Sequence, residues 1–165
     1  MGIPIVNVAG LASIYVSGSL FGYTQDGARI TTEGHAINIH GDENGGDEGP
    51  PVEIQYLGET ARVRLEMTKW DPSVQAALES RLNSGTPGTP GVTGTLVFTS
   101  GAYYRLTIAS PITPRNFPCA TLERTPMEIN KGTKYSRLIV EFECYKNPVA
   151  SNGAGIGVLW NTATA

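Results

Sequence analysis

The clearest pattern along the chain is a strict alternation of apolar and polar residues. In residues 61–68 every second side chain is apolar, and the same period of two recurs in residues 103–108 and 137–144. Because successive side chains of a β-strand point to opposite faces, these segments predict three strands, each with one core face and one face that is wet or contacts a partner.

Shorter segments suggest further strands, separated by clusters of Gly, Pro, Asn and Asp that are typical of turns. These weaker candidates are residues 11–16, 28–32, 36–40, 95–99 and 120–123. Alternating strands joined in this way predict a mainly β chain, built as an antiparallel β-sandwich or barrel.

One helix is predicted to flank the β structure, over about residues 72–83. Asp71 can accept amide hydrogens of the first turn, and Pro72 sits where its missing N–H costs nothing. Apolar residues then recur at helical spacing, and Gly85 marks a plausible end. We expect this helix to lie across the open face or mouth of the β structure, with Trp70 packed between strand and helix.

The length fits a single β domain, residues 1–165, with two irregular segments. Residues 41–51 contain four acids and four glycines and predict a long exposed loop. Residues 148–165 predict an extended C-terminal tail with few charges, in which Trp160 is one of few anchors. This tail could dock on a neighbouring chain or on its own barrel, and the sequence leaves both possibilities open.

Composition and charge exclude several classes of function. The 20 glycines and 11 prolines indicate many turns, which suits an all-β chain. With a net charge of −3 and no run of Lys or Arg, tight binding of nucleic acid is disfavoured. The apolar runs are too short to cross a bilayer, and the first residues lack the features of a secretory signal, so we expect synthesis in a cytoplasm and no membrane association.

A metal site is the first chemical hypothesis, because His35, His40 and the acids of the loop lie close together in sequence. An odd offset of five places the two imidazoles on opposite faces of a strand, and the acids do not follow the calcium-loop spacing. We therefore interpret residues 41–51 as a solvated acidic loop, although a metal ion bound there stays possible.

No catalytic residue or cofactor site is predicted, so we expect a protein that is not an enzyme. The chain has no Gly-x-Ser-x-Gly motif, and Cys119 and Cys144 lie in apolar segments where thiols are usually inert. A hydrolase would need a site around His35 or His40, which no surrounding motif marks. The strand acids alternate with arginines and are better explained as members of cross-strand charge pairs.

The order of elements then suggests a family. Residues 51–59, ending in Tyr-Leu-Gly-Glu, lead into the alternating strand and then into the helix opened by Trp70 and Asp71. Late in the chain a Gly-Thr-Lys turn at residues 132–134 opens the strand of residues 135–142. In these motifs, over roughly residues 50–145, the chain resembles the tail tube proteins of tailed bacteriophages.

This resemblance implies a β-barrel or sandwich with one flanking helix, which tail tube proteins share with the tube protein of type VI secretion. It implies a virion structural protein of the tail, assembled in the host cytoplasm. Its partners would be further copies of itself and other virion tail proteins. Six copies would close into a ring, and stacked rings would form a conduit that DNA passes through during ejection without specific binding.

Two sets of residues become candidates for assembly. The candidate ring-bridging loop contains Asp42, Glu43, Asp47 and Glu48. The candidate lumen or subunit-contact faces of the strands contain Arg62, Arg64, Glu66, Arg137, Glu141 and Glu143. The alternatives are another phage β-structured virion protein, of the neck, tail-completion or baseplate type, and a carbohydrate-binding module.

Overall fold

The structure, a computed structural model, describes residues 12–80, 94, 96–110, 114–132, 136–150 and 154–162, without the side chains at positions 25, 26, 44 and 80. The strands are β1 Ser13–Val16, β2 Ser19–Ile39, β3 Glu53–Trp70, β4 Tyr104–Ala109, β5 Arg115–Thr121, β6 Met127–Lys131 and β7 Ser136–Cys144. The helices are α1 Pro72–Ser80, α2 Val97–Ser100 and the 3-10 helices η1 Asp42–Asn44 and η2 Gly46–Glu48. None of these helices is long and apolar enough to span a bilayer.

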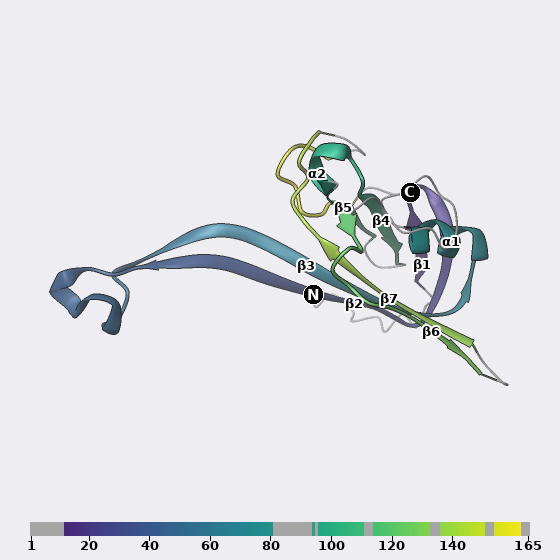
Figure 1. The fold of residues 1–165 in the computed structure, drawn as a ribbon, viewed down its shortest axis with the longest axis horizontal. Helices are drawn as coiled ribbons and strands as arrows, with labels where there is room; N and C mark the ends of the chain where they lie inside the picture. Colours follow the sequence, from purple (N-terminus) through teal and green to yellow (C-terminus); the bar gives the residue numbers. More distant parts are fainter. Residues whose placement is uncertain are drawn as a thin grey trace, which may run out of the picture.

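The strands form an antiparallel sheet in the order β3-β2-β1-β4-β5-β7-β6. An additional pairing of β3 with β7 joins the two sides of this sheet and closes it into a barrel (Figure 1). Closure leaves few unpaired strand edges within the barrel, which limits uncontrolled edge-to-edge association. The predicted mainly β, antiparallel architecture with a flanking helix is confirmed.

The hydrophobic core fills the barrel and follows the alternation read from the sequence. On β3 the side chains of Val63 and Leu65 are fully buried, and Val63 lies in register with Phe142 of β7. Two further fully buried aromatic residues, Phe21 and Phe117, enter the same cluster from β2 and β5. Each such side chain contributes about 1.5–3 kcal/mol when it is removed from water.

Helix α1 begins as its sequence predicts. The Asp71 carboxylate accepts hydrogen bonds from the Ser73 backbone N–H, at 2.8 Å, and from the Ser73 hydroxyl, at 2.7 Å. These bonds favour the ionised form and hold the pKa of Asp71 below its ordinary value. Trp70 donates its indole N–H to Gln75, and Leu78 is fully buried in the core, so the helix is anchored at both ends. The predicted residues 81–83 lie outside the described ranges.

The predicted strand at residues 95–99 is wrong, because Val97–Ser100 forms helix α2. A short apolar run fits a strand and a helical turn equally well, so its period cannot decide between them. Here Gly101 adopts a left-handed conformation and its N–H bonds to the carbonyl oxygen of Phe98, which closes a helical turn. The weak candidates at 28–32 and 36–40 belong to one long strand, β2, and β6 was not predicted.

The polar face predicted for β4 is not wet at Thr107, which is buried. The Thr107 hydroxyl donates to Asn116 at 3.0 Å, and the Asn116 amide donates to Asn161 at 3.0 Å. The backbones of Asn116 and Asn161 also form an antiparallel bridge, and the Arg115 guanidinium lies 4.2 Å from the centre of the Trp160 ring. The described end of the chain, residues 154–162, therefore docks on its own barrel, as one of the two alternatives expected.

Candidate assembly surface

Strands β2 and β3 continue far beyond the barrel. Strand β7 pairs with β3 only between Ala61 and Met67, so from the pair Glu33 and Thr60 outward β2 and β3 pair only with each other. We call residues 33–60 the arm. Figure 1 shows it as a long two-stranded ribbon that projects from one side of the barrel, with η1 and η2 at its far end.

The arm exposes large hydrophobic side chains on both of its faces. These exposed residues are Ile37, Ile39, Val52, Ile54, Tyr56 and Leu57, with Tyr56 62% exposed. Ile54 pairs with Asn38 and Tyr56 with Ala36, so they lie on the face opposite to Ile37 and Ile39. An isolated two-stranded ribbon is marginally stable in water, and a contiguous exposed apolar surface marks an interaction site. The arm therefore has the properties of one half of an interface.

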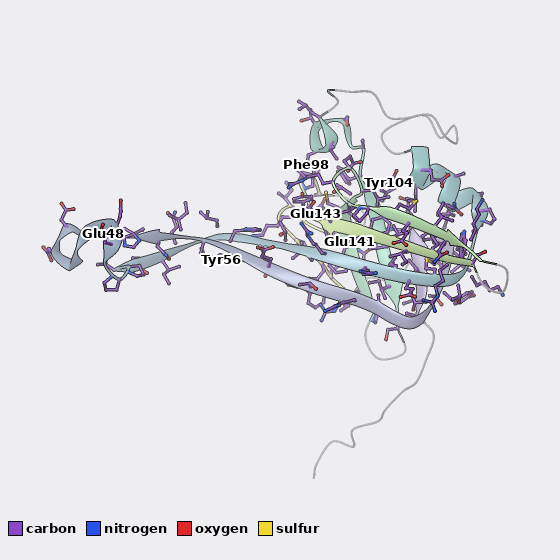
Figure 2. The ribbon with its side chains drawn as sticks, turned by 60° about the horizontal axis from the view of Figure 1, so that its bottom comes forward. Glu48, Tyr56, Phe98, Tyr104, Glu141 and Glu143 are labelled. Carbon is purple, nitrogen blue, oxygen red and sulfur yellow. The ribbon has the colours of Figure 1, made fainter. Side chains whose placement is uncertain are left out.

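The tip of the arm carries the predicted ring-bridging acids. Asp42 and Glu43 lie in η1, while Asp47 and Glu48 lie in η2, and all four side chains are exposed. Gly45 separates the two turns in a left-handed conformation with a φ of 92°, which other residues adopt only with strain. Figure 2 places Glu48 at the far end of the arm. None of the four acids forms an ion pair with a described cation.

The chemistry-bearing residues of the described ranges do not gather into a reactive centre. No group of three or more His, Cys, Asp or Glu side chains in those ranges is placed to hold a metal ion. His35 hydrogen-bonds to Thr60 across the arm, at 3.0 Å between Nε2 and Oγ1. Burial raises the pKa of Cys119 to about 12 and the pKa of Cys144 well above its ordinary value, so neither is a thiolate at neutral pH.

The outer face of β3 and β7 holds cross-strand ion pairs, as the alternation of charges predicts. Arg62 Nη1 lies 3.5 Å from Glu141 Oε1, and Arg137 Nη1 lies 2.8 Å from Glu66 Oε1. Both arginine side chains are more than half exposed, and such surface pairs contribute at most about 1 kcal/mol each. These pairs therefore shape the charge of the face more than they stabilise the barrel.

Arg64 lies on the same face, with an anion beside it on one strand and a cation beside it on the other. It is in register with Glu141 of β7 on one side and with Arg29 of β2 on the other. Two hollows, of about 210 Å³ and 560 Å³, are both lined by Arg29 and Arg64. Arg29 is not among the candidates predicted from the sequence, although it lies within the weak strand candidate of residues 28–32. Its position opposite Arg64 depends on strand register, which a local pattern does not specify.

Glu143 differs from the other predicted face residues, because it is only 8% exposed. Strand β7 is paired on both sides at this point, with Arg62 of β3 and Thr121 of β5, and the Arg124 Nε atom lies 3.9 Å from the carboxylate. Burial raises the pKa of the neighbouring Tyr145, and a hydrogen bond with Glu143 raises this pKa further. Glu143 is therefore not on a wet face in the isolated chain, and its role in a lumen or subunit contact stays a prediction.

The structure keeps the two predicted sets of residues apart. Asp42 lies thirteen positions after Arg29, and β2 is extended over nearly all of this length. At about 3.3 Å per residue, the acidic tip lies roughly 40 Å from the arginines of its own barrel. Within one chain the tip and the charged face therefore cannot meet.

Comparisons with known proteins give little further guidance. No protein-family model matches the chain, and a search of curated proteins found no match. Among solved structures, the chain is similar to one described as "Virion of native gene transfer agent (GTA) particle". The similarity has a TM-score of 0.41 and 8% identity, and covers 79% of this chain and 82% of that chain. A TM-score of this size carries no functional argument, so only the arm and the faces of the barrel bear on function.

Proposed function

We propose that this chain is a virion structural protein, a tail tube subunit whose copies close into rings that stack through their arms. The observation that carries the proposal is the arm of residues 33–60. Its strands pair with nothing but each other, and it exposes apolar side chains on both faces. A protein that acts as a monomer gains nothing from such a ribbon, whereas a subunit gains contact with its neighbours.

The energetics of the arm require a partner. A ribbon of two strands cannot bury its own side chains. The conformational entropy lost when its backbone becomes ordered is therefore offset only by hydrogen bonds between the two strands and by contacts between neighbouring side chains. Docking on a neighbour would remove Ile54 and Tyr56 from water on one face of the arm, and Ile37 and Ile39 on the other face. At roughly 25 cal/mol per Å² of apolar surface, six such side chains supply a substantial driving force for association.

The length of the arm suits contact between stacked rings. Asp42, at the tip of the arm, lies nine positions after Glu33, where the arm leaves the barrel. An extended strand of this length reaches about 30 Å, which is the diameter of a small domain. One arm can therefore span a neighbouring subunit rather than only touch its edge.

The ring and the tube come from the sequence resemblance over residues 50–145. Tail tube subunits form a β-barrel with a flanking helix and close into rings, which we expect here to be hexameric. A net charge of −3 suits a conduit that a polyanion passes without being retained. The proposed location is the tail of the virion, with other tail proteins as additional partners. No step of this role requires catalysis.

Shortening the arm tests the proposal. Gly34 and Glu59 form a cross-strand pair, so residues 35–58 can be replaced by Asn-Gly, which favours a tight hairpin turn. We expect electron microscopy to show stacked rings or tubes for the wild-type protein, but single rings or monomers for the shortened variant. Circular dichroism should show an intact barrel in both proteins, because the core lies outside the replaced segment.

Other results would favour other functions. Tubes of normal length from the shortened variant would overturn the role of the arm. Single wild-type rings that never stack would favour a neck, tail-completion or baseplate protein. A wild-type monomer at high concentration that binds glycans on an array would instead favour a carbohydrate-binding module.

A further inference from the structure

We infer that the acidic tip of one copy docks on the facing arginines Arg29 and Arg64 of another copy. This inference rests on the proposed function and names the surface that receives the arm. It also assigns the outer face of β2 and β3 to subunit contact rather than to the wall of a lumen.

The receiving surface is a pair of guanidinium groups in register. Arg29 of β2 and Arg64 of β3 are direct cross-strand partners, and both are exposed. Like charges placed directly opposite each other destabilise a sheet. The chain retains this unfavourable pair in the middle of a barrel face, and binding of an anion would convert it into a favourable one.

The neighbouring carboxylates are already engaged. Glu141, the register partner of Arg64 on β7, forms its ion pair with Arg62. Glu66, which shares a hollow with Arg29 and Arg64, forms its ion pair with Arg137. Among the described side chains, Arg29 and Arg64 therefore form no ion pair of their own, and the hollows beside them are open to an incoming group.

The tip has the complementary composition. Its four exposed carboxylates, on Asp42, Glu43, Asp47 and Glu48, fall within seven consecutive residues. Arginine favours such partners, because its planar group can bond both oxygens of a carboxylate at once. Two turns of 3-10 helix present these acids at the end of a projecting ribbon, which is a geometry suited to insertion.

The partner must be a second copy of the chain. Figure 2 shows Glu48 at the far end of the arm and Glu141, which marks the charged face, on the barrel. The separation along β2 of roughly 40 Å prevents the tip from folding back onto its own arginines without breaking the strand. In a stack of rings, however, the arm of each subunit extends toward the barrels of the neighbouring ring.

A nucleic acid is the less favoured occupant of this face. Binding to DNA gains affinity from many phosphate contacts, each of which releases counterions. Here two unpaired arginines are flanked by Glu66 and Glu141, so the face offers few contacts and some repulsion. A short acidic turn needs only two cations and fits this arrangement better.

Charge reversal tests the contact. We expect Arg29→Glu combined with Arg64→Glu to lower the yield of tubes at least about tenfold, in electron microscopy and sedimentation, because attraction becomes repulsion. Reversing the tip, with Asp42, Glu43, Asp47 and Glu48 all changed to Lys, should have the same effect. Combining both sets should restore assembly. The control Lys69→Glu with Lys131→Glu makes an equal change of charge elsewhere on the exposed surface and should leave assembly intact.

The outcomes separate this inference from the proposed function. A milder variant, Arg29→Gln with Arg64→Gln, guards against misfolding, and circular dichroism verifies the barrel of every variant. Normal tubes from both arginine variants would overturn the inference while the proposed function stands. Normal tubes combined with loss of binding to a duplex DNA probe would assign the arginines to phosphate contacts. A wild-type chain that never assembles would overturn both.

Discussion

Among the described glycines, Gly22 is the one at which an added side chain would meet the closest neighbouring atoms. This residue pairs with Ile14 of β1 and with Trp70 of β3, so the strand is enclosed on both sides. A Cβ atom at position 22 would lie 2.2 Å from the carbonyl oxygen of Lys69 and 2.8 Å from the Cα of Trp70. Backbone atoms cannot turn away as a flexible side chain can, so only glycine fits here without displacing a strand.

Gly22→Ala should lower the free energy of unfolding by about 3 kcal/mol, because overpacking forces the backbone of β3 to move. Gly34 provides a matched control, since it lies in β2 with open space where a Cβ would stand. We expect Gly34→Ala to change the free energy of unfolding by less than about 0.5 kcal/mol. Urea denaturation of the two variants measures both values, and equal effects would contradict the packing described for Gly22.

At the level of whole elements, residues 154–162 near the end of the chain pack as part of the barrel. The Asn147 backbone N–H donates to Val158 at 2.9 Å, and the Gly157 N–H donates back to Asn147 at 2.8 Å. Leu159 then enters the hydrophobic core with 5% of its surface exposed. This segment covers the outer side of β4 and β5, where Thr107 and Asn116 would otherwise meet water.

Leu159→Ala should therefore cost about 2–5 kcal/mol of unfolding free energy, the range for truncating a buried leucine. Leu96→Ala removes the same atoms from a side chain that is 70% exposed, and should cost less than about 0.5 kcal/mol. Thermal and urea denaturation of both variants give the comparison. A Leu159→Ala effect as small as that of Leu96→Ala would mean that the segment is not docked in solution.

At the scale of the whole molecule, stability is divided unequally between barrel and arm. The barrel has a closed sheet around one buried cluster, whereas the arm has two strands and no core of its own. Regions with few buried apolar contacts open at a lower free energy than the core does. The isolated chain therefore combines a stable support with a ribbon that gains its stability from assembly.

Hydrogen exchange should show this division directly. In the dilute, unassembled protein we expect peptides from residues 33–60 to exchange much faster than those from residues 61–70, because only the latter pair with β7. After assembly, exchange in the arm should slow by at least about tenfold, while exchange in the barrel stays nearly unchanged. Strong protection of the arm in the monomer would contradict an arm that depends on its neighbours.

Some features could be predicted because they depend on residues close in sequence. The alternation in residues 61–68 and 137–144 placed β3 and β7 and identified Val63, Leu65 and Phe142 as buried. The cap at Asp71 followed from a side chain and amide groups within one helical turn. Local sequence did not reveal helix α2, because a short apolar run is compatible with both the strand period of two and the helical period of about 3.6 residues.

Among the predicted site residues, too, the outcome depended on whether a feature is set by residues close in sequence or by distant ones. Arg62 and Arg137 form the cross-strand ion pairs that the pattern of charges predicted. Glu143 was expected on an open face, but it is buried, with Arg124 and Tyr145 beside its carboxylate. Arg29 was not selected at all, since the register that sets it opposite Arg64 joins residues 35 positions apart.

Local residue patterns were enough to predict which side of β3 and β7 faces the core, where the first helix begins and that no apolar run is long enough to cross a bilayer. These properties arise from backbone geometry and side-chain polarity over a few consecutive residues. The extension of β2 and β3 beyond their neighbours, which forms the arm, follows from contacts that no local pattern predicts. Whether a strand has a partner depends on segments far away in the chain, and nothing in residues 53–60 marks the point where pairing with β7 ends.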